Sequence, residues 1–186
     1  MAQTRIPFVG GNWKMNTDAA SAVAMARGGA AGVDDSCQAA VFPPFVYLTA
    51  GREAIRGSKV ILGAQDVYHE PNGAFTGEVS VAMLKDCGVQ VVLTGHSERR
   101  HVLGESDDLV NKKTRAVLDA GLACILCVGE KLEEREAGKT DAVNERQVRA
   151  GLAGGSPEHL AAGRVGIADE PVWGIGGGKN AAAAGA

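Results

Sequence analysis

Three segments of this sequence carry residues that can do acid–base and anion-binding chemistry. They are "GGNWKMN" with Asn12 and Lys14, "GHSERR" with His96 and Glu98, and "ADEPVWGIGGGK" with Glu170. A lysine at the end of a strand points towards a ligand crevice, and the glycines before it let the main chain approach a ligand closely. A glutamate beside Pro, Val, Trp and Ile loses water when its loop closes, which suits a general base.

The charged residues that follow His96 favour a functional site over a purely structural one. Glu98, Arg99 and Arg100 come directly after it, and we expect them to support the ring from behind. A helix that begins at Ser97 or Glu98 would point its N-terminus at His96. That arrangement favours a neutral imidazole that donates a hydrogen bond.

Simpler interpretations exist for all three segments. Lys14 can lie over the apolar Trp13, as lysines commonly do. His96 can be a hydrogen-bonded part of the scaffold, and Glu170 can be a surface carboxylate before a loop. These alternatives stay open on the single residues alone.

Six apolar runs predict the strands that position these segments. Each run is hydrophobic almost throughout and does not alternate, which is typical of parallel strands covered on both faces. The expected strands span residues 6–13, 38–44, 59–65, 89–95, 122–129 and 164–169.

Helical patterns lie between these strands. Residues 17–32 begin with Thr17 or Asp18 as N-cap, residues 106–121 begin at Ser106 and stop at Gly121, and residues 140–155 follow the same pattern. Alternating strands and helices predict an α/β fold with right-handed crossovers. Six units fit either an open doubly wound sheet or a (β/α)8 barrel that is two units short, and periodicity does not choose between them.

Composition and charge exclude several classes of protein. The 186 residues are 45% hydrophobic and 22% charged, as expected of one globular domain. A formal net charge of -3 gives no electrostatic case for nucleic acid or an anionic membrane as partner. No run approaches the ~20 apolar residues of a membrane span. The N-terminus lacks the pattern of a signal peptide, so we expect a cytoplasmic protein.

The chain has four cysteines, which are Cys37, Cys87, Cys124 and Cys127. The pair in "CILC" has no second pair and no histidine cluster near it, so we expect no metal and no other cofactor. The pair lies in an apolar run, where a free cysteine behaves as a small hydrophobe. Reduced thiols are typical of the cytoplasm.

Taken together, the motifs resemble the triosephosphate isomerase family. The resemblance runs from "FVGGNWKMN" through "GAFTGE", "GHSERRHVLGES" and "CVGEKLEEREAGKT" to "EPVWGIGGGK", and so covers nearly the whole chain. It implies a TIM (β/α)8-type parallel barrel with the site at the carboxyl ends of its strands. A nucleotide-binding open sheet is disfavoured because no GxGxxG follows the first strand.

The resemblance implies an aldose–ketose isomerase that interconverts dihydroxyacetone phosphate and glyceraldehyde 3-phosphate through an enediolate, in glycolysis and gluconeogenesis. Glu170 matches the base of the family, and His96 matches its neutral electrophile. Lys14 matches the cation that offsets the phosphate and enediolate charge, and Asn12 matches a substrate-binding residue. Gly176 would offer its backbone N–H to the phosphate.

Three further positions match residues with supporting roles in the family. Glu98 resembles a residue that orients the catalytic group, and Cys127 resembles a buried structural cysteine. The segment "PNGAFTGE" resembles the third loop that family dimers insert into the partner subunit, with Thr76 reaching the site of the partner. A homodimer is therefore expected.

The sequence also departs from the family pattern. In the family, two more βα units follow the sixth loop and bring glycine-rich turns that bind most of the phosphate. Here residues 1–179 are expected to form one barrel-type domain of about six units, with an alanine-rich tail at 180–186. Fewer phosphate contacts predict weaker substrate binding. The alternative function is a catalytically impaired, shortened barrel that serves as an interaction or assembly module.

Overall fold

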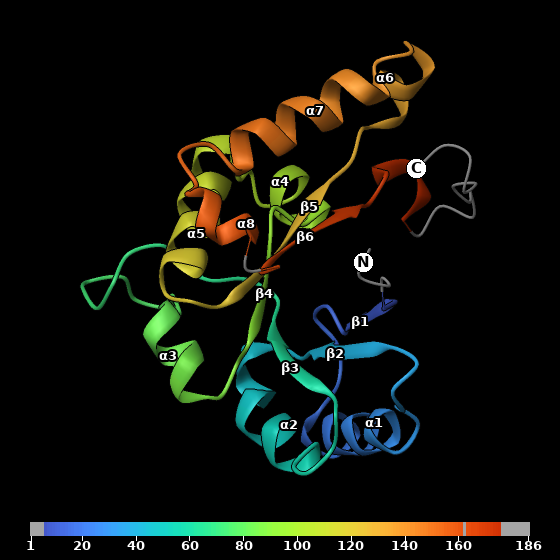
Figure 1. Ribbon diagram of the computed structural model, residues 1–186, viewed down its shortest axis with the longest axis vertical. Helices are drawn as coiled ribbons and strands as arrows, with labels where there is room; N and C mark the ends of the chain where they lie inside the picture. Colours follow the sequence, from blue (N-terminus) through green and yellow to red (C-terminus); the bar gives the residue numbers. More distant parts are fainter. Residues whose placement is uncertain (1–5, 162, 176–186) are drawn as a thin grey trace. The chain divides into compact units, whose positions relative to one another are not determined.

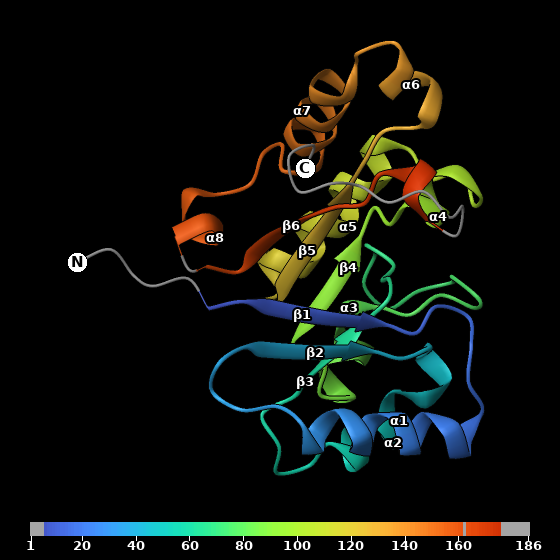
Figure 2. The same ribbon diagram turned by 90° about the vertical axis from the view of Figure 1, so that its right-hand side faces the viewer.

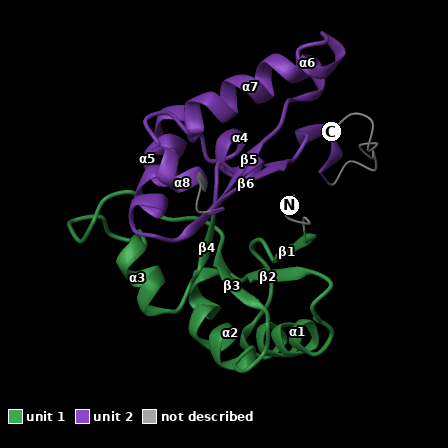
Figure 3. Cartoon of the chain, in the orientation of Figure 1, with its two compact units in different colours: residues 1–92 green, residues 93–186 purple. Residues whose placement is uncertain are grey.

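The computed structural model describes residues 6–161 and 163–175. The chain divides into two compact units, residues 1–92 and residues 93–186, with the boundary inside strand β4 (Figure 3). The strands follow one another in the sheet in the order β1-β2-β3-β4-β5-β6, and every described register between neighbours is parallel.

Unit 1 contains β1 (Phe8–Asn12), β2 (Gln38–Phe42), β3 (Ile61–Ala64) and the first half of β4 (Val91–Thr94). Its helices are α1 (Ala19–Ala31), η1 (Phe45–Tyr47), α2 (Leu48–Ala54) and α3 (Val81–Asp86). Helices α1 and α2 pack side by side on one side of β1 and β2 (Figures 1 and 2). In the register of β1 and β2, Asn12 lies opposite Phe42.

Unit 2 contains the second half of β4, then β5 (Ala123–Val128) and β6 (Val165–Asp169). Its helices are α4 (Ser97–His101), α5 (Asp107–Asp119), α6 (Leu132–Glu136), α7 (Thr140–Gly151), α8 (Pro157–Ala161) and η2 (Val172–Gly174). Helices α5 and α7 pack against each other and against β5 (Figure 1).

A small apolar core joins these elements of unit 2. It consists of the buried side chains of Val110 from α5 and Leu126 and Val128 from β5, and Val148 and Leu152 pack against it. Burial of each such side chain contributes roughly 1.5–3 kcal/mol to folding. The core therefore holds the end of β5 in a fixed position relative to α5 and α7.

Two of the three expected helix starts are confirmed, whereas the third expectation was wrong: α7 has Lys139 as its N-cap without a side-chain cap bond, and it ends at Gly151 and not at residue 155. Asp18 is the N-cap of α1, where its carboxylate accepts from the Ser21 N–H in a capping box. Ser106 is the N-cap of α5, and its hydroxyl accepts from the Leu109 N–H. These caps satisfy N–H groups in the first turn that have no partner within the helix.

All six predicted strands are present, each inside its predicted span. Their order follows the chain from β1 to β6, which is the connectivity of a (β/α)8-type barrel. A doubly wound sheet instead reverses its strand order near the middle. The strand order therefore decides between the two architectures that periodicity left open.

Two expectations about the ends of the chain are untested. The expected tail, residues 180–186, lies outside the described residues, and the assignment of residues 1–179 to one domain stays a prediction. The helices of the described part of the chain were also compared with the requirements of a membrane span. None of them has the length and apolar character that a membrane crossing requires.

Candidate functional site

In unit 1 the main chain at Lys14 adopts a left-handed conformation that is held from both sides. Its φ angle is 54°, which is uncommon for a residue with a side chain. The Lys14 N–H donates to Oδ1 of Asn12 over 2.9 Å. Nε2 of Gln65 donates to the Lys14 carbonyl over 2.9 Å and to the Phe42 carbonyl over 2.8 Å. The end of β1 and the start of its loop are thus tied to the ends of β2 and β3.

Gln65 was missed by the sequence analysis, which considered only the residues around Lys14 itself. Its signal was a polar side chain at the carboxyl end of the third apolar run, where a parallel barrel has its site. The amide satisfies two main-chain carbonyls at once, and so we regard it as the residue that stabilises the strained turn at Lys14.

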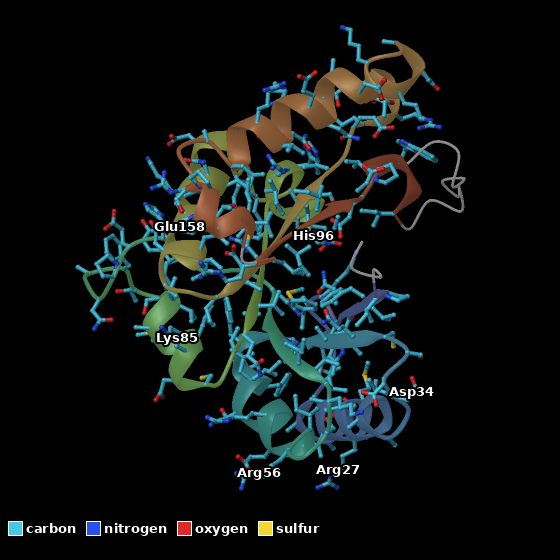
Figure 4. All side chains as sticks on the ribbon, viewed as in Figure 1. Arg27, Asp34, Arg56, Lys85, His96 and Glu158 are labelled. Atoms are coloured by element: carbon cyan, nitrogen blue, oxygen red, sulfur yellow. The ribbon has the colours of Figure 1, made fainter. Side chains whose placement is uncertain are left out.

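In unit 2 the ring of His96 (labelled in Figure 4) has a defined hydrogen-bonding state. His96 is the N-cap of α4, and its Nδ1 accepts from the Glu98 N–H over 3.2 Å. A ring nitrogen that accepts a hydrogen bond carries no proton. In a neutral ring the proton then resides on Nε2, which lies 3.5 Å from Oε2 of Glu170. The helical turn expected after His96 is confirmed, and the Glu98 N–H in its first turn donates to the ring.

Glu170 follows β6 and extends the pairing of that strand with β5, because its N–H donates to the Val128 carbonyl over 2.7 Å. Its Oε2 is buried and finds no hydrogen-bond partner among the described residues. A buried carboxylate oxygen without a donor is rare, because such a group normally costs free energy to bury. The atom next to it is the Nε2 of His96, the only part of the ring left to donate.

Cys127 on β5 contacts the same carboxylate. Burial raises the pKa of the Cys127 thiol well above its ordinary value, and the negative charge of Glu170, with a hydrogen bond to it, raises this pKa further. The cysteine is buried, as expected. The sequence analysis assigned it to packing alone, and its contact with Glu170 was missed because nothing local links two residues on neighbouring strands.

Gly129 lets the end of β5 approach Glu170 closely. Its φ angle is 159°, and a Cβ at this position would collide with the carbonyl of Glu170. The buried side chain of Gln147 from α7 makes two hydrogen bonds to the same residue. Its Oε1 accepts from the Gly129 N–H over 2.8 Å, and its Nε2 donates to the Gly129 carbonyl over 3.3 Å. The main chain on which Glu170 rests is therefore fixed by α7.

The turn that follows Glu170 is anchored by one carboxylate. Oε1 of Glu130 accepts from Nε1 of Trp173 over 2.9 Å, and from Arg135 and Thr140 over 3.2 Å each. The guanidinium of Arg135 also lies 4.5 Å from the ring centre of Trp173. Burial pushes the pKa of Glu130 up, but these hydrogen bonds outweigh burial and lower the pKa below its ordinary value.

The structure brings some of the expected site residues together. His96, Glu98 and Glu170 meet in unit 2, where Oε2 of Glu98 lies 3.7 Å from Nδ1 of His96. Asn12 and Lys14 meet in unit 1.

Two further expectations fall elsewhere. Thr76 lies in an exposed stretch, residues 71–78, between β3 and α3, and Gly176 lies outside the described residues. In the part of the chain that the structure describes, no group of three or more His, Cys, Asp or Glu residues could hold a metal ion.

Comparison with known proteins adds to this geometry. The family model of triosephosphate isomerase matches residues 7–186. The chain is 50% identical over 175 residues to a triosephosphate isomerase of Treponema denticola, a match that covers 94% of this chain and 69% of that protein. It is 52% identical over 183 residues to the triosephosphate isomerase of Treponema pallidum, covering 94% and 70%. A relative from Carboxydothermus hydrogenoformans is 50% identical over 179 residues, covering 95% and 70%.

Proposed function

Because the chain belongs to the triosephosphate isomerase family, whose members are isomerases, we propose that it interconverts dihydroxyacetone phosphate and glyceraldehyde 3-phosphate. This reaction would serve glycolysis and gluconeogenesis in the cytoplasm, where the four free cysteines would stay reduced. The observation that carries the proposal is the buried, unpartnered Oε2 of Glu170 at 3.5 Å from Nε2 of His96.

In the proposed reaction Glu170 is the base. Its carboxylate removes a proton from the carbon next to the carbonyl group, and the electron pair of that C–H bond forms the C=C bond of an enediolate. The carbonyl oxygen takes up the negative charge. The carboxylic acid of Glu170 then returns the proton to the neighbouring carbon, so that no proton is gained or lost overall. An Oε2 atom without a hydrogen-bond partner among the described residues is suited to this task, because it can approach the substrate C–H bond directly.

His96 would stabilise the enediolate through the proton on Nε2. A neutral imidazole donates a hydrogen bond to the developing oxyanion and can relay the proton between the two enediol oxygens. The Glu98 N–H supports this role because it occupies Nδ1 and so keeps the proton on the opposite nitrogen. A donor fixed before the reaction needs no reorganisation when charge develops.

The remaining residues would bind the substrate. We propose that Lys14 offsets the charge of the phosphate and the enediolate, that Asn12 binds a substrate oxygen, and that Gly176 gives its N–H to the phosphate. The hydrogen bonds at Lys14 support its part in the proposal, because they fix the main chain from which the ammonium group extends.

We also propose a homodimer in which Thr76 reaches the partner subunit. The whole stretch from residue 71 to 78 is exposed in the single chain, including the aromatic side chain of Phe75. An exposed loop with an apolar side chain at its centre is typical of a segment that a partner covers.

A coupled isomerase assay of the 186-residue chain, after its intact mass has been verified, tests the proposed activity. Glu170→Gln removes the base and should lower kcat by about 10³-fold, the range found for a general base. His96→Gln should lower it by about 10²-fold or more. The matched control is Glu133→Gln, which removes an exposed carboxylate on α6. Equal activity of the Glu170 and Glu133 variants would overturn the assignment of the base.

A further inference from the structure

The guanidinium of Arg100 is buried behind the candidate site and bonds to three separate elements. The side chain is only 6% exposed. Its Nε donates to the Gly95 carbonyl over 2.7 Å, its Nη1 to Oδ1 of Asp107 over 2.6 Å, and its Nη2 to the Cys127 carbonyl over 3.4 Å. A buried cation that gives two of its three hydrogen bonds to main-chain carbonyls does more than balance a charge.

The two carbonyls belong to the strand ends that carry the candidate chemistry. Gly95 directly precedes His96 at the end of β4, and Cys127 lies on β5 beside the carboxylate of Glu170. Because a guanidinium is planar and its N–H groups form a rigid fork, it holds two acceptors at a fixed separation. The end of β4 and the end of β5 are thus tied to one rigid group.

The main-chain conformation at Gly95 links the guanidinium of Arg100 to the ring of His96. Gly95 has a φ angle of 71°, and a Cβ there would lie 2.7 Å from Nη2 of Arg100. The left-handed turn is thus packed directly on the guanidinium. The same turn leads into α4, whose Glu98 N–H holds Nδ1 of His96.

We propose that Arg100 is a positioning residue for the isomerase reaction, holding Nε2 of His96 in place against Glu170. The proposal rests on the function proposed above. Without the fork of Arg100 the buried Gly95 carbonyl loses its donor, the turn at Gly95 relaxes, and the His96 ring no longer has one fixed orientation. The Nε of the neighbouring Arg99 donates instead to Oε1 of Glu105 over 2.6 Å.

The contact with Asp107 offers a way to separate positioning from simple charge pairing. Asp107 also accepts from Arg146, whose side chain is 56% exposed. Arg146 therefore shares the carboxylate with Arg100, while no hydrogen bond described for it reaches Gly95 or Cys127. Arg146→Gln and Asp107→Asn are matched controls, because each disturbs the ion pairs of Asp107 and leaves the two carbonyl bonds of Arg100 in place.

Arg100→Lys is the test variant. Lysine keeps the positive charge and can still pair with Asp107, but it has no planar fork to bridge the two carbonyls. We expect kcat to fall between about 10-fold and 100-fold, the cost of a catalytic group misplaced by up to about 1 Å. KM should stay within about 3-fold, because Arg100 does not touch the substrate. Both control variants should keep kcat within about 3-fold of the unmodified chain.

A second readout does not depend on activity. Nitrogen-15 NMR of the unmodified chain should show His96 as one neutral tautomer with its proton on Nε2, and Arg100→Lys should show averaging between both tautomers. An inactive unmodified chain with this NMR change would refute the proposed function and leave the positioning role intact. Unchanged kcat and an unchanged tautomer in Arg100→Lys would overturn the positioning role, as would an equal loss of kcat in Asp107→Asn.

If the lysine variant does not fold, Arg100→Gln takes its place. The glutamine amide can still donate one hydrogen bond to the Gly95 carbonyl but cannot also reach the Cys127 carbonyl. We expect this variant to fold and to lose kcat in the same direction. Full kcat together with a single His96 tautomer would again contradict the role of Arg100.

Discussion

Two carboxyl groups near the end of β6 have pKa values shifted in opposite directions, because their neighbours differ. Glu130 is buried yet receives three hydrogen bonds, which lower its pKa. Asp169 is exposed at the end of β6, and its carboxylate accepts one bond from Asn144 over 3.3 Å. Partial burial raises the pKa of Asp169, and the negative charge of Glu130 raises it further. For Asp169, burial and the charge of Glu130 therefore outweigh the bond from Asn144 and the positive charge of Arg135, which lower its pKa.

Replacing Asp169 by asparagine should stabilise the protein slightly at neutral pH. A raised pKa in the folded chain means that the folded chain binds this proton more tightly than the unfolded chain. Ionised Asp169 therefore lowers the free energy of unfolding. This loss of stability is absent in acid and develops as the pH rises through the pKa of the folded chain. Asp169→Asn should raise the free energy of unfolding at pH 7 by a few tenths of a kcal/mol, since exposure to solvent weakens the effect.

Urea unfolding at pH 7 and at pH 4.5 measures this difference. The gain in Asp169→Asn should shrink at the lower pH, because the wild-type carboxyl is then partly protonated in the folded chain. Asparagine can still accept the bond from Asn144, so that contact is retained. A variant that is less stable than the parent at pH 7, or a gain independent of pH, would contradict the expected sign.

At the scale of elements, the candidate base is placed by the way β5 and β6 end together. Their register runs from Cys124 opposite Val165 to Val128 opposite Asp169, and the Glu170 N–H adds one more bond to it. The chain then leaves β5 through Gly129, directly against the main chain of Glu170. The position of the candidate base is therefore fixed by main-chain contacts at the ends of β5 and β6.

A side chain at Gly129 should disturb this arrangement strongly. Gly129→Ala would force the Cβ into the Glu170 carbonyl, and we expect a loss of stability of about 2–4 kcal/mol, typical of a substitution that overpacks a close main-chain contact. We also expect kcat to fall, because the carboxylate of Glu170 must shift with its main chain.

The matched control for this change is Gly166→Ala on β6. A Cβ there meets Cγ1 of Ile125 at 3.5 Å, an ordinary contact. Its stability, measured by urea unfolding, should stay within about 1 kcal/mol of the parent chain. Equal stabilities and equal kcat values for the two alanine variants would show that the contact between Gly129 and Glu170 does not place the base.

At the scale of the whole molecule, the expected site residues are divided between two compact units. Unit 1 carries Asn12 and Lys14, and unit 2 carries His96 and Glu170. The chain also spans about 70% of the length of the curated relatives it matches. In unit 1 the residues from 71 to 78 are all exposed, and this is the segment that we assign to contact with a partner subunit.

We expect the protein to sediment as a dimer whose mass is twice that of one chain. Thr76→Arg should shift it towards the monomer and lower the specific activity at low protein concentration, because a charged side chain would be buried in the interface. Thr49→Arg changes another exposed threonine, on α2, and should leave both properties unchanged. Sedimentation equilibrium over a 100-fold range of about micromolar concentrations measures the mass, and a monomeric unmodified chain would refute the expectation.

Much of the fold was predictable because its determinants are local. A continuous apolar run indicates a parallel strand wherever it occurs, and all six runs form strands. Asp18 and Ser106 begin α1 and α5 because a short polar side chain can accept from an N–H two or three residues later. The motifs also nominated His96 and Glu170 as candidate site residues, and their side chains lie 3.5 Å apart in the structure.

The contacts around those residues were not predictable, because they join distant parts of the chain. Trp173 bonds to Glu130, 43 residues before it, and Arg100 to the Cys127 carbonyl, 27 residues after it. No periodicity in the sequence relates such pairs. The sequence by itself determined the strands, the starts of α1 and α5, and the chemical types available to the site. Only the tertiary structure decided which donor meets which acceptor, because these pairs form when separate strand ends come together at one edge of a sheet.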